Sequence, residues 1–108
     1  MAEKIMMFGP AVAAASGIWT DVSQYHPGKS LYVEGLGAGE SMDIRAANGP
    51  KPSSSASGSL LVTLTGGTSP QFYQTGLMVN QFDWLITNKT VASGSSTSAV
   101  LSAEVRRQ

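Results

Sequence analysis

The sequence predicts an all-β protein, a single antiparallel β-sandwich or jelly roll of about seven to eight short strands with an N-terminal arm. Several segments alternate apolar and polar residues with a period of two, the pattern of a half-buried strand. Clusters of Gly, Pro, Ser and Asn separate these segments at short intervals, and no long segment has helical periodicity. A chain of 108 residues has the length of one domain.

The last part of the chain has the clearest strands. The segment 97–106 alternates cleanly, and the segment 82–89 is rich in aromatic and β-branched residues. The small, polar connection 90–96 contains one Gly, so we expect a hairpin in which these two strands pair with each other.

The earlier strands are expected, in order, at 16–22, 29–35, 40–46, 59–65 and 71–73. Period-two alternation assigns one face of each strand to the interior. The predicted core is Ile18, Leu31, Val33, Met42, Ile44, Val62, Leu64, Trp84, Ile86, Leu101 and Val105.

Two connections stand out between these strands. The segment 35–39 (GLGAG) superficially resembles a phosphate-binding loop but lacks the helix that such a loop requires, so we expect a hairpin turn there. The segment 48–59 is rich in Pro, Gly and Ser, and we expect a mobile loop or tip.

Residues 1–15 are expected to form an N-terminal arm or edge strand, and residues 16–108 the β-sandwich domain. Lys4 ahead of an apolar run and the small residues 13–15 are compatible with a secretory signal, but Glu3 and the interruption by Gly9 and Pro10 argue against one. The apolar side chains of residues 5–8 must dock on this subunit or on a neighbour.

Composition excludes several classes of function. Only 13% of the residues are charged and the formal net charge is zero, so the sequence has no basic excess for nucleic acid or an anionic membrane. The chain has no Cys, which excludes disulfides and thiolate zinc sites, and no apolar run reaches the ~20 residues of a membrane span.

No catalytic set is apparent. His26 is the only histidine, and the spacing of the seven acidic residues selects no pair for acid–base catalysis. Most of these carboxylates fall at outward strand positions, where solvated surface is expected. We therefore expect neither an enzyme nor a cofactor or metal site.

The candidate binding residues are apolar and aromatic. We expect Trp84 and Phe82 in the core, whereas Trp19 and Tyr32 lie opposite the aliphatic residues of their strands and suit a second buried surface, such as a subunit contact. An exposed row of Trp19, Tyr25 and Tyr32 would instead indicate a carbohydrate-binding module. The predicted interface is Ile5, Met6, Met7, Phe8, Trp19, Tyr25 and Tyr32.

The order of three segments resembles the small β-sandwich virion proteins of tailed bacteriophages, namely capsid decoration (cement) and head-fibre proteins. The first segment is 19–33, with a Trp strand followed by a short turn and a second strand. The others are 40–49 (ESMDIRAANG) and 82–105, with FDWLI, a Gly/Ser connection and VLSAEV. Residues 51–59 depart from the pattern of these virion proteins, because they stand where that pattern has a tighter turn.

This resemblance implies a non-enzymatic capsid decoration protein that binds and stabilises a shell of major capsid protein. It implies a homo-oligomer, often a trimer, in a virion assembled in the host cytoplasm. A tail, baseplate or fibre component is the alternative role in the same particle.

Overall fold

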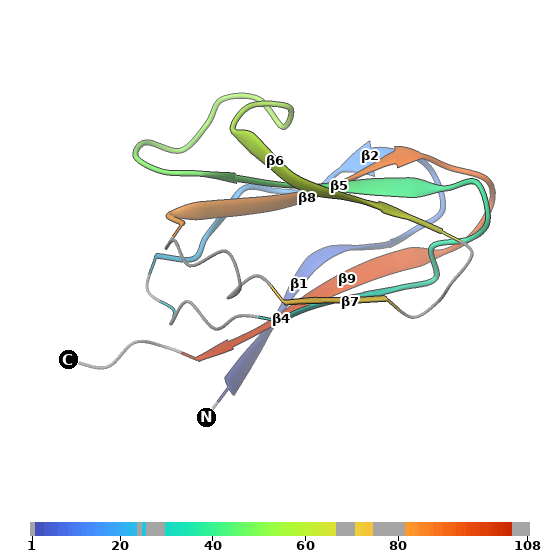
Figure 1. The fold of residues 1–108 in the computed structure, drawn as a ribbon, viewed down its shortest axis with the longest axis horizontal. Coiled ribbons are helices and arrows are strands. Elements are labelled where there is room, and N and C mark those ends of the chain that lie inside the picture. The colour runs from blue at the N-terminus through green and yellow to red at the C-terminus, as the bar shows by residue number, and fades with distance from the viewer. Residues whose placement is uncertain (1, 24, 26–29, 67–70, 75–81, 105–108) are drawn as a thin grey trace.

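The computed structural model describes residues 2–23, 25, 30–66, 71–74 and 82–104, which form nine strands in two layers (Figure 1). The strands are β1 (Ala2–Ala11), β2 (Ala15–Ser16), β3 (Thr20–Asp21), β4 (Ser30–Glu34), β5 (Ser41–Ala47), β6 (Ser59–Thr65), β7 (Gln71–Gln74), β8 (Trp84–Val91) and β9 (Thr97–Glu104). The predicted antiparallel β-sandwich is confirmed.

The two layers are a four-stranded and a five-stranded sheet. The four-stranded sheet has the order β1-β9-β4-β7, and the five-stranded sheet has the order β2-β8-β5-β6, with β3 also pairing with β8. All of these pairs are antiparallel. Among the described strands, the chain crosses to the other layer at nearly every connection, and only β5 and β6 are paired neighbours in sequence.

The period-two predictions for the central strands are confirmed. Leu31 and Val33 of β4 are buried, as are Met42, Ile44 and Ala46 of β5. In β9, Thr97, Ala99 and Leu101 are buried and alternate with half-buried residues. These side chains meet between the two sheets and form one apolar core.

The predicted hairpin of the last two strands is wrong. The strand β8 pairs with β5, whereas β9 pairs with β1 and β4 in the opposite sheet. The predicted hairpin turn at 35–39 is wrong for the same reason, because β4 and β5 also lie in different sheets. Both connections bend from one layer to the other and are held by hydrogen bonds to Glu40.

The segment expected to form an arm or edge strand is β1, an edge of the four-stranded sheet. It pairs with β9 from Ala2 opposite Glu104 to Ala11 opposite Thr97. The register shifts between Met6 and Phe8, so the alternation breaks and both Met7 and Phe8 are buried in the core of the same chain.

The predicted core needs three corrections. Ile18 is 74% exposed, because residues 17–19 lie between the short strands β2 and β3 and follow no strand alternation. Val62 and Leu64 are only partly buried. Trp84 and Ile86 lie on the outer side of β8, opposite Leu85, which packs in the core; Val105 lies outside the described residues.

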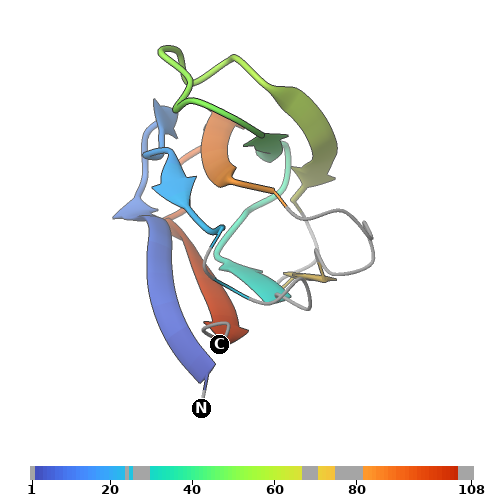
Figure 2. The same cartoon turned by 90° about the vertical axis from the view of Figure 1, so that its left-hand side faces the viewer.

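The 48–59 connection does not project as a tip. It folds back over the outer side of β8, as Figure 2 shows. The Trp84 Nε1–H donates to the Gly49 carbonyl at 2.9 Å, and the Asn88 side-chain amide donates to the Ser55 carbonyl at 2.8 Å. The outer side of β8 is therefore covered, which explains why Ile86 is buried there.

Candidate functional site

The predicted interface residues do not form one surface. Met7, Phe8, Trp19 and Tyr25 are each at most 7% exposed, so they offer almost no area to a partner. Met6, by contrast, is 58% exposed, and Ile5 and Tyr32 are partly exposed. An interface role remains a prediction for these last three residues.

Trp19 is a structural residue of the covering loop. Its Nε1–H donates to the Ser54 carbonyl at 2.9 Å, and its ring lies so close to Gly58 that a Cβ there would be 3.1 Å from the ring edge. Because Trp19 and Tyr25 are buried, they do not form the exposed aromatic row that a carbohydrate-binding module requires.

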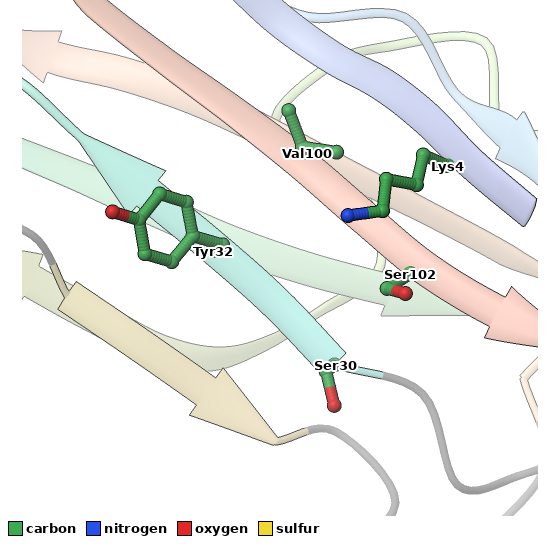
Figure 3. Close-up of a pocket in the computed structure, with 5 residues that line it drawn as sticks. All are labelled: Lys4, Ser30, Tyr32, Val100 and Ser102. Atoms are coloured by element: carbon green, nitrogen blue, oxygen red, sulfur yellow. The ribbon is translucent and has the colours of Figure 1, made fainter. Parts of the chain in front are cut away.

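A hollow of about 480 Å³ lies on the outer side of the four-stranded sheet. Figure 3 shows the five side chains that line it, from β1, β4 and β9: Lys4, Ser30, Tyr32, Val100 and Ser102. The hollow forms where two serines lie between larger neighbours, and the Lys4 side chain extends from β1 over β9. It combines an ammonium group, hydroxyl groups and an aromatic ring on a β-sheet floor.

A second hollow, of about 320 Å³, lies along the β1 edge and is lined by residues of β1 and of the segment 15–18. The exposed side chains of Met6 and Ile18 border it. This edge is apolar, but β1 has an irregular register and contains Pro10, which cannot donate a ladder hydrogen bond. A regular added strand is therefore disfavoured along this edge.

The most unusual polar group of the structure is a buried ion pair. The Lys89 Nζ lies 3.3 Å from Glu40 Oε2, and both side chains are fully buried. Glu40 Oε1 accepts from the Gly37 N–H at 2.8 Å, while Oε2 accepts from the backbone N–H groups of Ser93 and Ser95.

Lys89 ties a third segment to the same point. Its Nζ donates to the Val12 carbonyl at 2.9 Å and to the Ser95 carbonyl at 2.7 Å. The pair therefore joins the β1–β2, β4–β5 and β8–β9 connections. Neither charge is accessible to a ligand, so the arrangement is suited to fixing these connections and not to chemistry on a substrate.

The hydrogen bonds set the charge state of Glu40. The Gly37 N–H, with further N–H donors from Ser93 and Ser95 and the Lys89 ammonium, lowers the pKa of Glu40 to about 2 against the opposing effect of burial. The carboxylate stays ionised at all ordinary pH values. Asp21 also has a lowered pKa, because it accepts hydrogen bonds from the Ser23 hydroxyl and N–H, but it is exposed.

This pair was not predicted from the sequence, where neither Glu40 nor Lys89 was given a role. Glu40 directly precedes β5, and Lys89 falls at a core-facing position of β8 in phase with Leu85 and Thr87. The available signal was the phase of Glu40, which matches that of the predicted core residues Met42 and Ile44. The sequence does not show that Lys89 is its partner.

The described part of the chain contains no group of three or more His, Cys, Asp or Glu side chains that could hold a metal ion. His26 lies outside the described residues. Asn88, the first residue of an Asn-Lys-Thr sequence, is buried and bonded through both side-chain polar atoms, to Gly17 and Ser55. None of the described residues belongs to a helix long and apolar enough to span a membrane.

No protein-family model and no curated protein sequence matches the chain. Among solved structures, it is similar to the SPBc2 prophage-derived protein YomS, with a TM-score of 0.64 and 9% identity over 96% of this chain and 94% of that one. It is also similar to a protein of Bacillus endospore appendages that form disulfide-linked pili, with a TM-score of 0.50 and 17% identity over 99% and 88% of the two chains. At such identities the similarity shows the fold alone. The expected resemblance to phage β-sandwich proteins is supported at that level.

Proposed function

We propose that the chain is a non-enzymatic structural protein of a bacteriophage particle. The observation that carries this proposal is the similarity to prophage-derived YomS, which extends over nearly the whole length of both chains. At 9% identity the two chains share the shape of the sandwich and not a set of side chains, and a shared shape suits an assembly component.

The two outer faces of the sandwich support a role in contacts. The 48–59 connection covers the β8 part of one face, whereas the hollowed outer face of β1, β9 and β4 bears no other described segment (Figure 1). A surface with few charges can be buried against another protein without desolvating many ions.

Disulfide bonds cannot link copies of this chain in an assembly. The endospore pili are described as disulfide-linked, but this chain has no Cys. Stability would then come from burial at contacts repeated over many copies, where modest single contacts combine into a strong assembly.

Within the particle, we favour a capsid decoration protein that binds the major capsid protein, with a tail, baseplate or fibre component as the second candidate. Contact through a sheet face is more favourable than contact through a released arm. Freeing β1 would expose Met7 and Phe8, each of which contributes roughly 1.5–3 kcal/mol when buried.

The test is to fractionate particles of the phage, or of the induced lysogen, that encodes the chain. Heads and tails are separated, and the chain is quantified in each fraction by mass spectrometry. We expect the chain in heads, in many copies per particle, and deletion of its gene should lower the temperature at which heads release DNA. Recovery with tails would favour the second candidate, and absence from particles would refute the proposal.

A further inference from the structure

The outer face of the four-stranded sheet has an ordered arrangement of side chains. The register places Lys4, Ser102 and Ser30 in one cross-strand row, and Met6, Val100 and Tyr32 in the next. A third row holds Ser98 opposite Glu34. All eight side chains point away from the core, since their neighbours on each strand point into it.

The charges of this face lie at opposite corners. Lys4 is on β1 in the first row, Glu34 is on β4 in the third row, and both are exposed. With strands about 4.8 Å apart and alternate residues about 6.8 Å apart, the two corners are separated by roughly 16 Å. Because the Lys4 side chain extends over β9, the two charges are nearer to each other than these corners, but Lys4 and Glu34 stay on strands that are not neighbours in the sheet.

We propose that this face binds the same face of a second copy of the chain, about a two-fold axis that passes over Val100. If the axis lies in the plane of the contact and perpendicular to the Lys4–Glu34 diagonal, each Lys4 faces the Glu34 of the other copy. The contact is isologous, with two identical ion pairs around an apolar centre. The strands of the two copies cross steeply, as in orthogonal sheet packing.

The same operation brings a projecting side chain to a hollow. It carries Tyr32 of one copy to the hollow of the other, between Val100 and Ser102, once the Lys4 side chain that extends over β9 there (Figure 3) has turned outward to meet Glu34 of the first copy. The two serines leave room there, and an aromatic ring with a polar end suits a site lined by both apolar and hydroxyl groups. Charge and shape are thus complementary under one symmetry operation.

The size of the face sets the strength of the contact. Three strands and three rows cover roughly 300 Å² per copy by strand spacing, which is well below the roughly 800 Å² per partner of stable complexes. We therefore expect a weak dimer that forms at high protein concentration and that repetition in an assembly would strengthen.

Reversing the charge of Lys4, of Glu34 or of both residues tests the proposed ion pairs. Lys4→Glu alone and Glu34→Lys alone each create two like-charge contacts in a homodimer, so sedimentation velocity should show at least a tenfold weaker association than in the natural chain. An equimolar mixture of the two variants restores both ion pairs in a heterodimer, and association should return. The double variant should also associate, while its corners remain too far apart to pair within one chain.

A cross-linking test locates the contact independently. Because the chain has no Cys, Val100→Cys introduces a single thiol on the proposed axis. Stacked sheets lie about 10 Å apart, too far for a direct disulfide, so a short bis-maleimide is used. Thr63→Cys is the matched control, since Thr63 is exposed on β6 of the other sheet. Val100→Cys should give cross-linked dimer and Thr63→Cys should not.

Circular dichroism verifies that each variant is folded. A chain that stays monomeric at millimolar concentration, a mixture that fails to associate, or equal cross-linking at the two cysteine positions would overturn the proposal. The dimer does not depend on the phage role. A monomeric chain found in phage heads would refute the dimer alone, and a dimeric chain absent from particles would refute the proposed function alone.

Discussion

Replacing Lys89 by methionine tests whether the buried ion pair holds the three connections together. Methionine keeps most of the length of the lysine side chain but removes the Nζ, which lies 3.3 Å from Glu40 Oε2 and donates to the Val12 and Ser95 carbonyls at 2.9 and 2.7 Å. The carboxylate would remain buried without its counter-charge, and two carbonyl groups would lose a donor.

The magnitude follows from this loss. Removing one member of a buried, hydrogen-bonded pair costs roughly 3–5 kcal/mol, a large part of the roughly 5–15 kcal/mol that stabilises a typical domain. With a urea dependence of roughly 1–3 kcal/mol per molar, the unfolding midpoint of the Lys89→Met variant should fall by about 2 M. Fluorescence of Trp19 and Trp84 reports the transition.

The matched control is Lys51→Met. Lys51 is an exposed lysine of the 48–59 connection, so the same chemical change should leave the midpoint nearly unchanged. If Lys89→Met is no less stable than Lys51→Met, the network does not hold the connections, and the structural role assigned to it is wrong.

Three further predictions concern the same framework. The Glu40 pKa of about 2 lies below the unfolded value near 4.5, so its contribution is complete above pH 4.5 and is lost as the pH falls toward 2; urea midpoints of Glu40→Gln should lack this dependence. Gly35→Ala should unfold the chain or strongly destabilise it, because a Cβ there would overlap a backbone carbonyl, whereas Gly39→Ala, with a similar φ of +81° but open space, should cost about 1 kcal/mol in urea titrations. Equal effects at the two glycines would contradict the close approach. Trp19→Phe should cost about 1 kcal/mol by removing the hydrogen bond to Ser54 and should raise hydrogen exchange in the 48–59 connection; unchanged exchange would mean that this bond does not hold it.

Local alternation predicted the strands well, because it reports which side chains of a strand are buried. It was reliable in β4, β5 and β9, where each strand has one face on the core. It misplaced Ile18 and Trp19, since the chain between β2 and β3 is not a strand, and it assigned Trp84 and Ile86 to the wrong face. An apolar residue on the outer side of β8 is explained only by a loop from another part of the chain.

The alternation of apolar and polar residues does not show which strands pair with each other. The connection 90–96 has the composition of a hairpin, yet it links two layers, because its backbone is bonded to the buried Glu40. That contact spans more than fifty residues of sequence, and no local pattern encodes it. For the same reason, the outer face of β1, β9 and β4 could not be assembled from the sequence, since its rows depend on which strands are neighbours.

The first and last described strands are partners, with Ala2 opposite Glu104 in an antiparallel pair. A force that pulls these two ends of the chain apart would therefore break the β1–β9 ladder one hydrogen bond at a time, which resists load poorly. A force applied across the flat faces would instead act on many contacts at once. If the chain bears mechanical load, attachment through a face would preserve its fold far better than tethering through its two ends.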